Sequence, residues 1–221
     1  MENSKTRRIT VSAVMLALAL AVSFVCGLIP FLNLPFGGGF TIASMLPVII
    51  IAYMYGTKWG LLTSFTYSVL QMLISFRTVS AFFMPTDDNY AGSVIKALLI
   101  CLLDYVIAYT VLGFGGIFRN KIKNKTVAIV LGCVVAISLR YLVHVISGYI
   151  FFGAWAEWFF SQDGFYAIGS KILATFSGNG LSLIYSFFYN GLYMIPEIII
   201  TAIVAVPVSR IPVVSKVGEV K

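Results

Sequence analysis

Six apolar stretches, separated by short polar segments, follow one another along the chain. They cover approximately residues 9–29, 41–55, 59–75, 94–118, 127–152 and 183–206. A helix needs about 20 mostly apolar residues to cross a bilayer, and these stretches reach or approach that length. The pattern therefore predicts an all-α integral membrane protein with six transmembrane helices, forming a single domain over residues 1–221.

The composition supports a membrane protein. Apolar residues make up 60% of the 221 residues and charged residues only 10%, whereas a soluble domain carries about 25% charged residues. These values exclude a soluble globule, a disordered chain and a disulfide scaffold. Three cysteines, Cys26, Cys101 and Cys133, lie inside apolar stretches without metal-type spacing. We interpret them as small residues of the core or the lipid-facing surface.

The basic residues predict the orientation. Eleven Lys and Arg lie in the segments that share a side with the N-terminus, against three on the other side, Arg77, Lys96 and Lys171. Because cytoplasmic loops carry the excess of Lys and Arg, both termini are predicted to be cytoplasmic. Two longer outer loops are then predicted, over approximately residues 76–93 and 153–182. The net charge of +7 comes from these short clusters. No basic and aromatic patch for nucleic acid accompanies them.

Four Asp, Glu, Arg or His residues lie within the predicted spans: Asp104, Arg140, His144 and Glu197. Such residues are costly in lipid and therefore indicate function. At 1.5 Å per residue, Asp104, His144 and Asn190 lie roughly 10–15 Å below the outer ends of three helices. This shared depth favours an outward-facing pocket for a small polar aromatic molecule. The alternative is that these groups satisfy one another, with Arg140 paired to Asp104 or Glu197 and no site remaining.

Enzyme motifs are missing from the sequence. It contains no phosphate-binding loop, no paired metal-binding histidines and no nucleophile-and-base arrangement. We therefore expect a binding component without catalysis, cofactor or metal.

Several stretches resemble a known family. The chain resembles, over nearly its full length, the thiamine-specific substrate-binding (S) components of energy-coupling factor (ECF) transporters. The stretches that carry the resemblance are residues 41–47 (Thr-Ile-Ala-Ser-Met-Leu-Pro), 103–105 (Leu-Asp-Tyr), 140–148, 185–191 and 193–197. The resemblance implies a six-helix fold with thiamine bound near the outer surface. It also implies contacts with thiamine from Asp104, Tyr105, His144, Tyr185 and Asn190. Stacking on the ligand is expected from Phe40, Phe152 and Trp155, which are the aromatic residues nearest the positions of the family's tryptophans.

The chemistry of thiamine suits these residues. A carboxylate at Asp104 accepts a hydrogen bond from the exocyclic amine and favours the cationic thiazolium ring. Asn190 offers a donor and an acceptor, and aromatic rings stack on a flat cation. His144 is expected to bind the hydroxyethyl tail or to orient Asp104.

The resemblance further implies a bacterial cell membrane location and partners: a transmembrane coupling subunit and two ATP-binding subunits. Ala13, Ala17 and Ala21 recur every four residues, which places them on one face of the first helix. In the family such a strip, here Ala13 and Ala17, contacts the coupling subunit; the alternative is packing within the chain. The rival functions are an S component for another vitamin or a thiamine precursor, and a stand-alone secondary transporter that uses Asp104 and Glu197.

Overall fold

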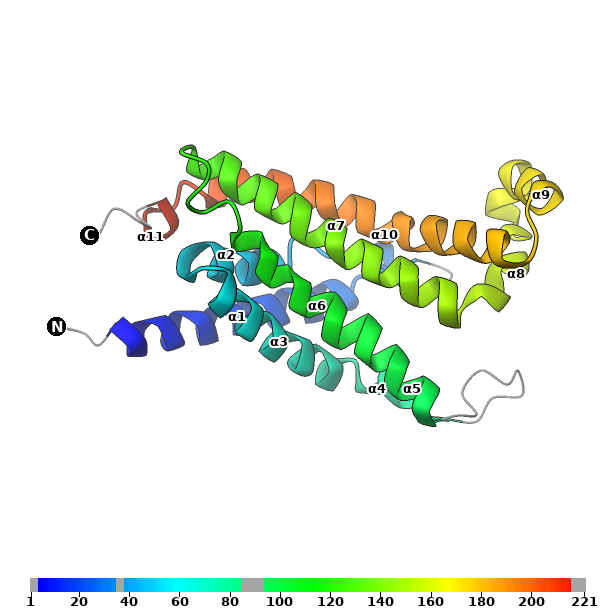
Figure 1. Ribbon diagram of the computed structural model, residues 1–221, viewed down its shortest axis with the longest axis horizontal. Helices are drawn as coiled ribbons and strands as arrows, with labels where there is room; N and C mark the ends of the chain where they lie inside the picture. The colour runs from blue at the N-terminus through cyan, green and yellow to red at the C-terminus, as the bar shows by residue number, and fades with distance from the viewer. Residues whose placement is uncertain (1–3, 35–37, 85–93, 216–221) are drawn as a thin grey trace.

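The computed structural model describes residues 4–34, 38–84 and 94–215 (Figure 1). Within these ranges all regular elements are helices, and an isolated antiparallel bridge joins Asn33 to Gly39. The long helices are α1 (Ser4–Gly27), α3 (Thr57–Ile74), α7 (Lys125–Phe151) and α10 (Gly178–Val208). The prediction of an all-α protein is confirmed for the part of the chain that the structure describes.

Among the described residues, four helical segments are long and apolar enough to cross a membrane: Lys5–Gly27, Val94–Gly116, Lys125–Phe151 and Gly178–Val208. They correspond to the first, fourth, fifth and sixth predicted spans. The second predicted span contains only the short α2 (Leu46–Tyr55), with 10 residues. The third corresponds to α3, whose 18 residues include the buried polar side chains of Thr63, Ser64, Ser68 and Gln71.

The fourth span is a continuous helical segment whose winding changes along its length. It consists of α5 (Val94–Cys101), the π-helical η2 (Leu102–Ile107), α6 (Ala108–Thr110) and the 3₁₀-helical η3 (Val111–Gly116). π-Helical turns are rare and are often found at functional sites.

Two predicted elements differ from the structure. Residues 41–45 are not helical, because Ala43 has a φ of 58°, which an α-helix does not contain. Helix α2 begins at Leu46, with Pro47 in its first turn, where proline is tolerated. The predicted outer loop over residues 153–182 is instead mostly helical. It contains η4 (Gly153–Trp155), α8 (Ala156–Phe160), η5 (Asp163–Phe165), α9 (Tyr166–Thr175) and the start of α10.

Three further short helices lie in the described ranges. They are η1 (Pro30–Leu32), α4 (Phe76–Ala81) and α11 (Pro212–Ser215). The α4 helix begins the other predicted outer loop, over residues 76–93, of which residues 85–93 lie outside the described ranges.

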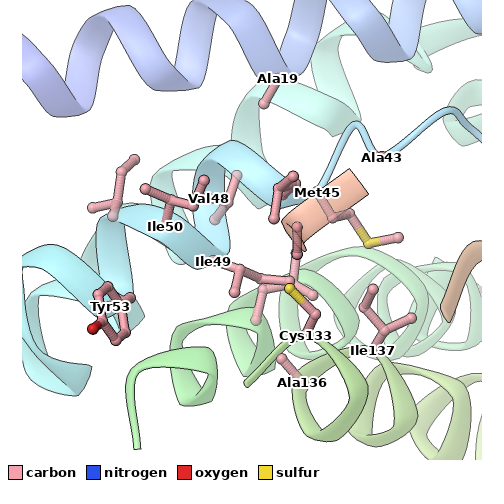
Figure 2. Packing of buried hydrophobic residues seen from close by; sticks show 14 of the residues in the cluster. Ala19, Ala43, Met45, Val48, Ile49, Ile50, Tyr53, Cys133, Ala136 and Ile137 are labelled. Atoms are coloured by element: carbon pink, nitrogen blue, oxygen red, sulfur yellow. The ribbon is translucent and has the colours of Figure 1, made fainter. Parts of the chain in front are cut away.

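The core is built around α2. Nine of the ten α2 residues are buried, as expected for a short helix that is apolar on all sides. Figure 2 shows Val48, Ile49 and Ile50 between Ala19 of α1 and the α7 residues Cys133 and Ile137. All three cysteines are free and buried, as predicted.

The long helices diverge from this core. Helices α7 and α10 pack side by side along their length, and α3 and α5 diverge from them toward the end of the molecule opposite α2 (Figure 1). At the end of the molecule where α2 lies, Figure 1 also shows the start of α1, the whole of α11 and the segment that precedes α7. The divergence leaves room for a polar site between the two groups of helices.

Candidate functional site

A cavity of about 1050 Å³ lies between the diverging helices. Its lining comes from α1, from residues 38–44, from α3 and α4, from η2 and α6, and from α7 and α10. Seven of the eight predicted substrate-binding residues line it: Phe40, Asp104, Tyr105, His144, Phe152, Tyr185 and Asn190. Trp155 is not among the lining residues; it is 38% exposed and packs edge-on against Trp158.

Asp104 is the carboxylate of this cavity that faces α7. Its Oδ1 lies 3.0 Å from Nδ1 of His144, and its Oδ2 accepts a hydrogen bond of 2.9 Å from the hydroxyl of Ser147. The π-helical turn of η2 places Asp104 and Tyr105 next to each other in the cavity wall. A carboxylate has about four acceptor positions, so two remain for a ligand.

His144 is a second group that is poised for a ligand. The residue is 9% exposed, and its Nε2 has no hydrogen-bond partner among the residues that the structure describes. With Asp104 ionised, Nδ1 carries the proton that the carboxylate accepts, and Nε2 of a neutral ring is then an acceptor. The pair thus offers a ligand two acceptors, one of them charged.

The predicted convergence of Asp104, His144 and Asn190 is seen in the structure. The amide nitrogen of Asn190 donates to the backbone oxygens of Ser186, at 2.9 Å, and His144, at 3.3 Å, and its Oδ1 accepts from the hydroxyl of Tyr193. The Asn190 amide therefore ties α10 to the turn of α7 that carries His144.

Tyrosine rings make up much of the remaining lining. Tyr105 and Tyr109 lie with their centroids 6.4 Å apart, and Tyr185 and Tyr189 with theirs 5.6 Å apart. Tyr109, Tyr189 and Tyr193 also line the cavity and were not predicted from the sequence. A signal was present, because Tyr185, Tyr189, Tyr193 and Glu197 recur every four residues and so occupy one face of α10.

Arg140 and Glu197 also line the cavity, and the alternative in which Arg140 neutralises a carboxylate fails. Arg140 donates from Nη1 to Sδ of Met45 at 2.9 Å and lies 4.2 Å from the centre of the Tyr109 ring. Glu197 accepts from the backbone N–H and the hydroxyl of Thr41, at 2.6 and 2.7 Å. Within the described ranges, Arg140 forms no ion pair with Asp104 or Glu197.

Ala13, Ala17 and Ala21 are exposed on α1. The buried face of this helix carries Leu16 and Ala19 instead. In this chain the alanine strip therefore does not pack against the protein's own core.

Comparisons with known proteins bear on what the cavity holds. Residues 13–162 match a family model described as "Thiamine transporter protein (Thia_YuaJ)". The chain belongs to this thiamine transporter family. It is also 30% identical, over 201 residues, to the thiamine transporter ThiT of Bacillus subtilis, covering 87% of this chain and 84% of that protein.

A solved structure of ThiT from Listeria monocytogenes shares the fold. The TM-score is 0.62 with 17% sequence identity, over 93% of this chain and 94% of the other. This family member is therefore a multi-pass protein of the bacterial cell membrane, and its relatives are transporters and not enzymes.

Proposed function

We propose that this member of the thiamine transporter family captures thiamine in the cavity around Asp104, as the S component of an ECF transporter. The Asp104 carboxylate is the observation that carries the proposal. It lines the cavity with His144 and Ser147 as its polar partners, and among the described residues no Lys or Arg forms an ion pair with it. A carboxylate shielded from bulk water is stabilised by a cation, and a monocationic ligand supplies one.

The shape of the lining also favours a flat cation. Tyr105, Tyr109, Tyr185 and Tyr189 line the same cavity as the carboxylate, and cations bind over aromatic faces. Thiamine combines a cationic thiazolium with an aminopyrimidine that donates hydrogen bonds. We propose that its exocyclic amine bonds to Asp104 or to Nε2 of His144, and that the rings of Phe40 and Phe152 close the site. Trp155 lies outside the cavity lining, so we expect it to contribute less to stacking on the ligand than Phe40 and Phe152 do.

Thiamine titration of the purified protein tests this proposal. We expect saturable binding of one thiamine per chain, measured by calorimetry and by tryptophan fluorescence. The free pyrimidine and other vitamins serve as competitors, and tighter binding of one of them would replace thiamine as the ligand. Thiamine uptake by the purified chain alone in liposomes would favour a secondary transporter instead.

The proposed topology is a single domain with six crossings and both termini in the cytoplasm. Helix α2, about 15 Å long at 1.5 Å per residue, is too short to cross alone. Residues 38–45 continue it without helical structure, and such backbone is tolerated in a membrane where protein or a cavity surrounds it. Labelling with a membrane-impermeant maleimide tests the orientation. We expect Lys171→Cys to react on intact cells, and Lys123→Cys to react only after permeabilisation.

We propose that the exposed strip of Ala13 and Ala17 contacts a transmembrane coupling subunit, which two ATP-binding subunits accompany. Small residues permit close helix approach in a membrane. Ala13→Trp and Ala17→Trp are expected to abolish copurification with the coupling subunit while thiamine binding by the isolated chain survives. Leu18→Trp, on a neighbouring exposed face, is the control. Normal assembly of both alanine variants would exclude this face.

A further inference from the structure

Residues 38–45, here called the wall segment, form one side of the cavity between η1 and α2. Gly38, Gly39, Phe40, Thr41 and Ser44 all contribute to the cavity lining. The segment has no helical structure of its own, and its Ala43 adopts a left-handed φ of 58°. A non-glycine residue keeps such a conformation only where its surroundings impose it. Tertiary contacts must therefore hold the wall segment in place.

Three helices supply these contacts. The backbone N–H of Ile42 lies 3.4 Å from Sγ of Cys26 on α1, and Met45 accepts from Arg140 on α7 through its sulfur. Both sulfur atoms are weak acceptors. The contact with α10 differs, because Glu197 accepts from Thr41 with both carboxylate oxygens, at 2.6 and 2.7 Å. Oxygen is a stronger hydrogen-bond acceptor than the thiol or thioether sulfur of the other two contacts.

The wall segment follows the face of α10 that lines the cavity. A Cβ atom built on Gly38 would lie 3.2 Å from the ring of Tyr193, and Thr41 meets Glu197 one helical turn further on. Each of the two carboxylates accepts hydrogen bonds with both of its oxygens, but Glu197 is only 3% exposed, whereas the side chain of Asp104 is 17% exposed. The carboxylate of Asp104 is thus the more accessible one to a ligand.

We propose that Glu197 is a positioning residue, which fixes the wall segment on α10 and so places Phe40 against the ligand without touching the ligand itself. This inference rests on the proposed binding of thiamine in the cavity. The two carboxylates of the cavity then have different tasks: Asp104 meets the ligand, and Glu197 shapes the wall.

A double-mutant cycle between Glu197 and Thr41 tests the proposal. Glu197→Gln places an amide where the carboxylate accepted two hydrogen bonds, and Thr41→Val removes the hydroxyl at nearly constant volume. Each single variant is expected to weaken thiamine binding on the order of tenfold, because the apparent affinity falls with the fraction of molecules whose wall is in place. The double variant is expected to bind no more weakly than the worse single variant. Multiplicative losses would show that Glu197 acts on the ligand directly and would overturn the proposal.

Two further variants separate positioning from a general loss of structure. Thr41→Ser keeps the hydroxyl and is expected to bind like the wild type. Thr201→Val, one turn beyond Glu197 on α10 and fully buried, alters a polar residue away from the cavity lining and is also expected to bind normally. If Glu197→Gln does not fold, Thr41→Val against Thr41→Ser carries the test, and equal affinities of these two would overturn the proposal.

Hydrogen exchange on the ligand-free protein distinguishes a failure of this inference from a failure of the proposed function. Glu197→Gln is expected to speed amide exchange of residues 38–45 while α7 stays protected. This result stands even if the wild type does not bind thiamine, which would overturn the proposed ligand alone. Unchanged exchange in the wall segment would overturn the role of Glu197.

Discussion

The region around α2 and the region around the cavity are held together in different ways. Around α2, apolar side chains pack together and backbones approach closely at glycines: a Cβ atom added at Gly116 would lie 2.3 Å from the oxygen of Ala52, and one at Gly132 would lie 2.2 Å from the oxygen of Gly115. Around the cavity, side-chain hydrogen bonds connect the helices, such as those of Asp104 with His144 and of Glu197 with Thr41.

The two kinds of contact suit different tasks, rigidity in the region around α2 and ligand binding in the region around the cavity. Close packing of glycine faces leaves no space for a ligand and fixes where α7 and η3 cross α2. The polar region retains unused acceptor positions at Asp104 and His144, which a packed apolar core does not have. The first region therefore sets the angle at which the helices diverge, and the second uses the space between them.

The largest effect is expected where the α2 region is overfilled. Gly132→Val places a branched side chain against the backbone of Gly115, which cannot move aside as a flexible side chain would. We expect a loss of more than about 4 kcal/mol in the free energy of unfolding, seen as a lack of folded protein in detergent. Gly180→Ala, whose nearest neighbour would lie 3.9 Å away, is the control and should express normally. Normal expression of Gly132→Val would refute the rigid packing of this region.

The apolar pattern was sufficient to predict much of the helical framework. Helix α7 was expected over residues 127–152 and is Lys125–Phe151, because long apolar stretches bounded by charges have few alternatives in a membrane. The helices of residues 153–175 were not expected. Their glycines and polar residues favour a loop locally, whereas packing of Phe159 and Phe160 against Tyr185 and Phe188 stabilises α8.

The site residues were easier to predict than their contacts. Depth along three helices indicated that Asp104, His144 and Asn190 would meet. That estimate assumed regular α-helix, and periodicity does not reveal the π-helical turn of η2. The bond between Glu197 and Thr41 joins residues 156 positions apart. A backbone N–H as partner leaves no trace in the sequence.

The next largest effect is expected in the cavity region, where a substitution should weaken thiamine binding without loss of stability. Asp104→Asn is expected to weaken thiamine binding by about 1.5–3 kcal/mol, or roughly ten- to hundredfold, because it removes a charge-assisted acceptor. The melting temperature is expected to change little, since an amide keeps the size of the side chain. Calorimetric titration measures the first effect and thermal unfolding the second. Asp163→Asn, exposed outside the cavity, is the control; unchanged affinity of Asp104→Asn would remove Asp104 from the ligand site.

A smaller effect is expected at the junction of α2 and α3. Gly56 has φ 89° and ψ 161°, a conformation that essentially only glycine adopts. Gly56→Ala is therefore expected to lower the free energy of unfolding by about 1–3 kcal/mol while thiamine affinity stays unchanged. Gly27→Ala, with open space around it and no positive φ, should not alter the melting temperature. A loss of affinity in Gly56→Ala would show that the two regions are coupled.

The smallest effect is expected at Ala43, which lies where the wall segment enters α2. Ala43→Gly relieves a left-handed conformation worth about 1–2 kcal/mol. It also removes a buried methyl group worth about 0.8 kcal/mol, and it increases the entropy of the unfolded chain at a cost of about 0.4–1 kcal/mol. These contributions nearly cancel, so we expect the melting temperature to stay almost unchanged. Ala43→Val keeps φ at 58° with a branched side chain in a position that is 6% exposed, and it should lower the melting temperature clearly. A rise for Ala43→Gly as large as the fall for Gly56→Ala would mean that the wall segment is strained without compensation from its buried methyl group.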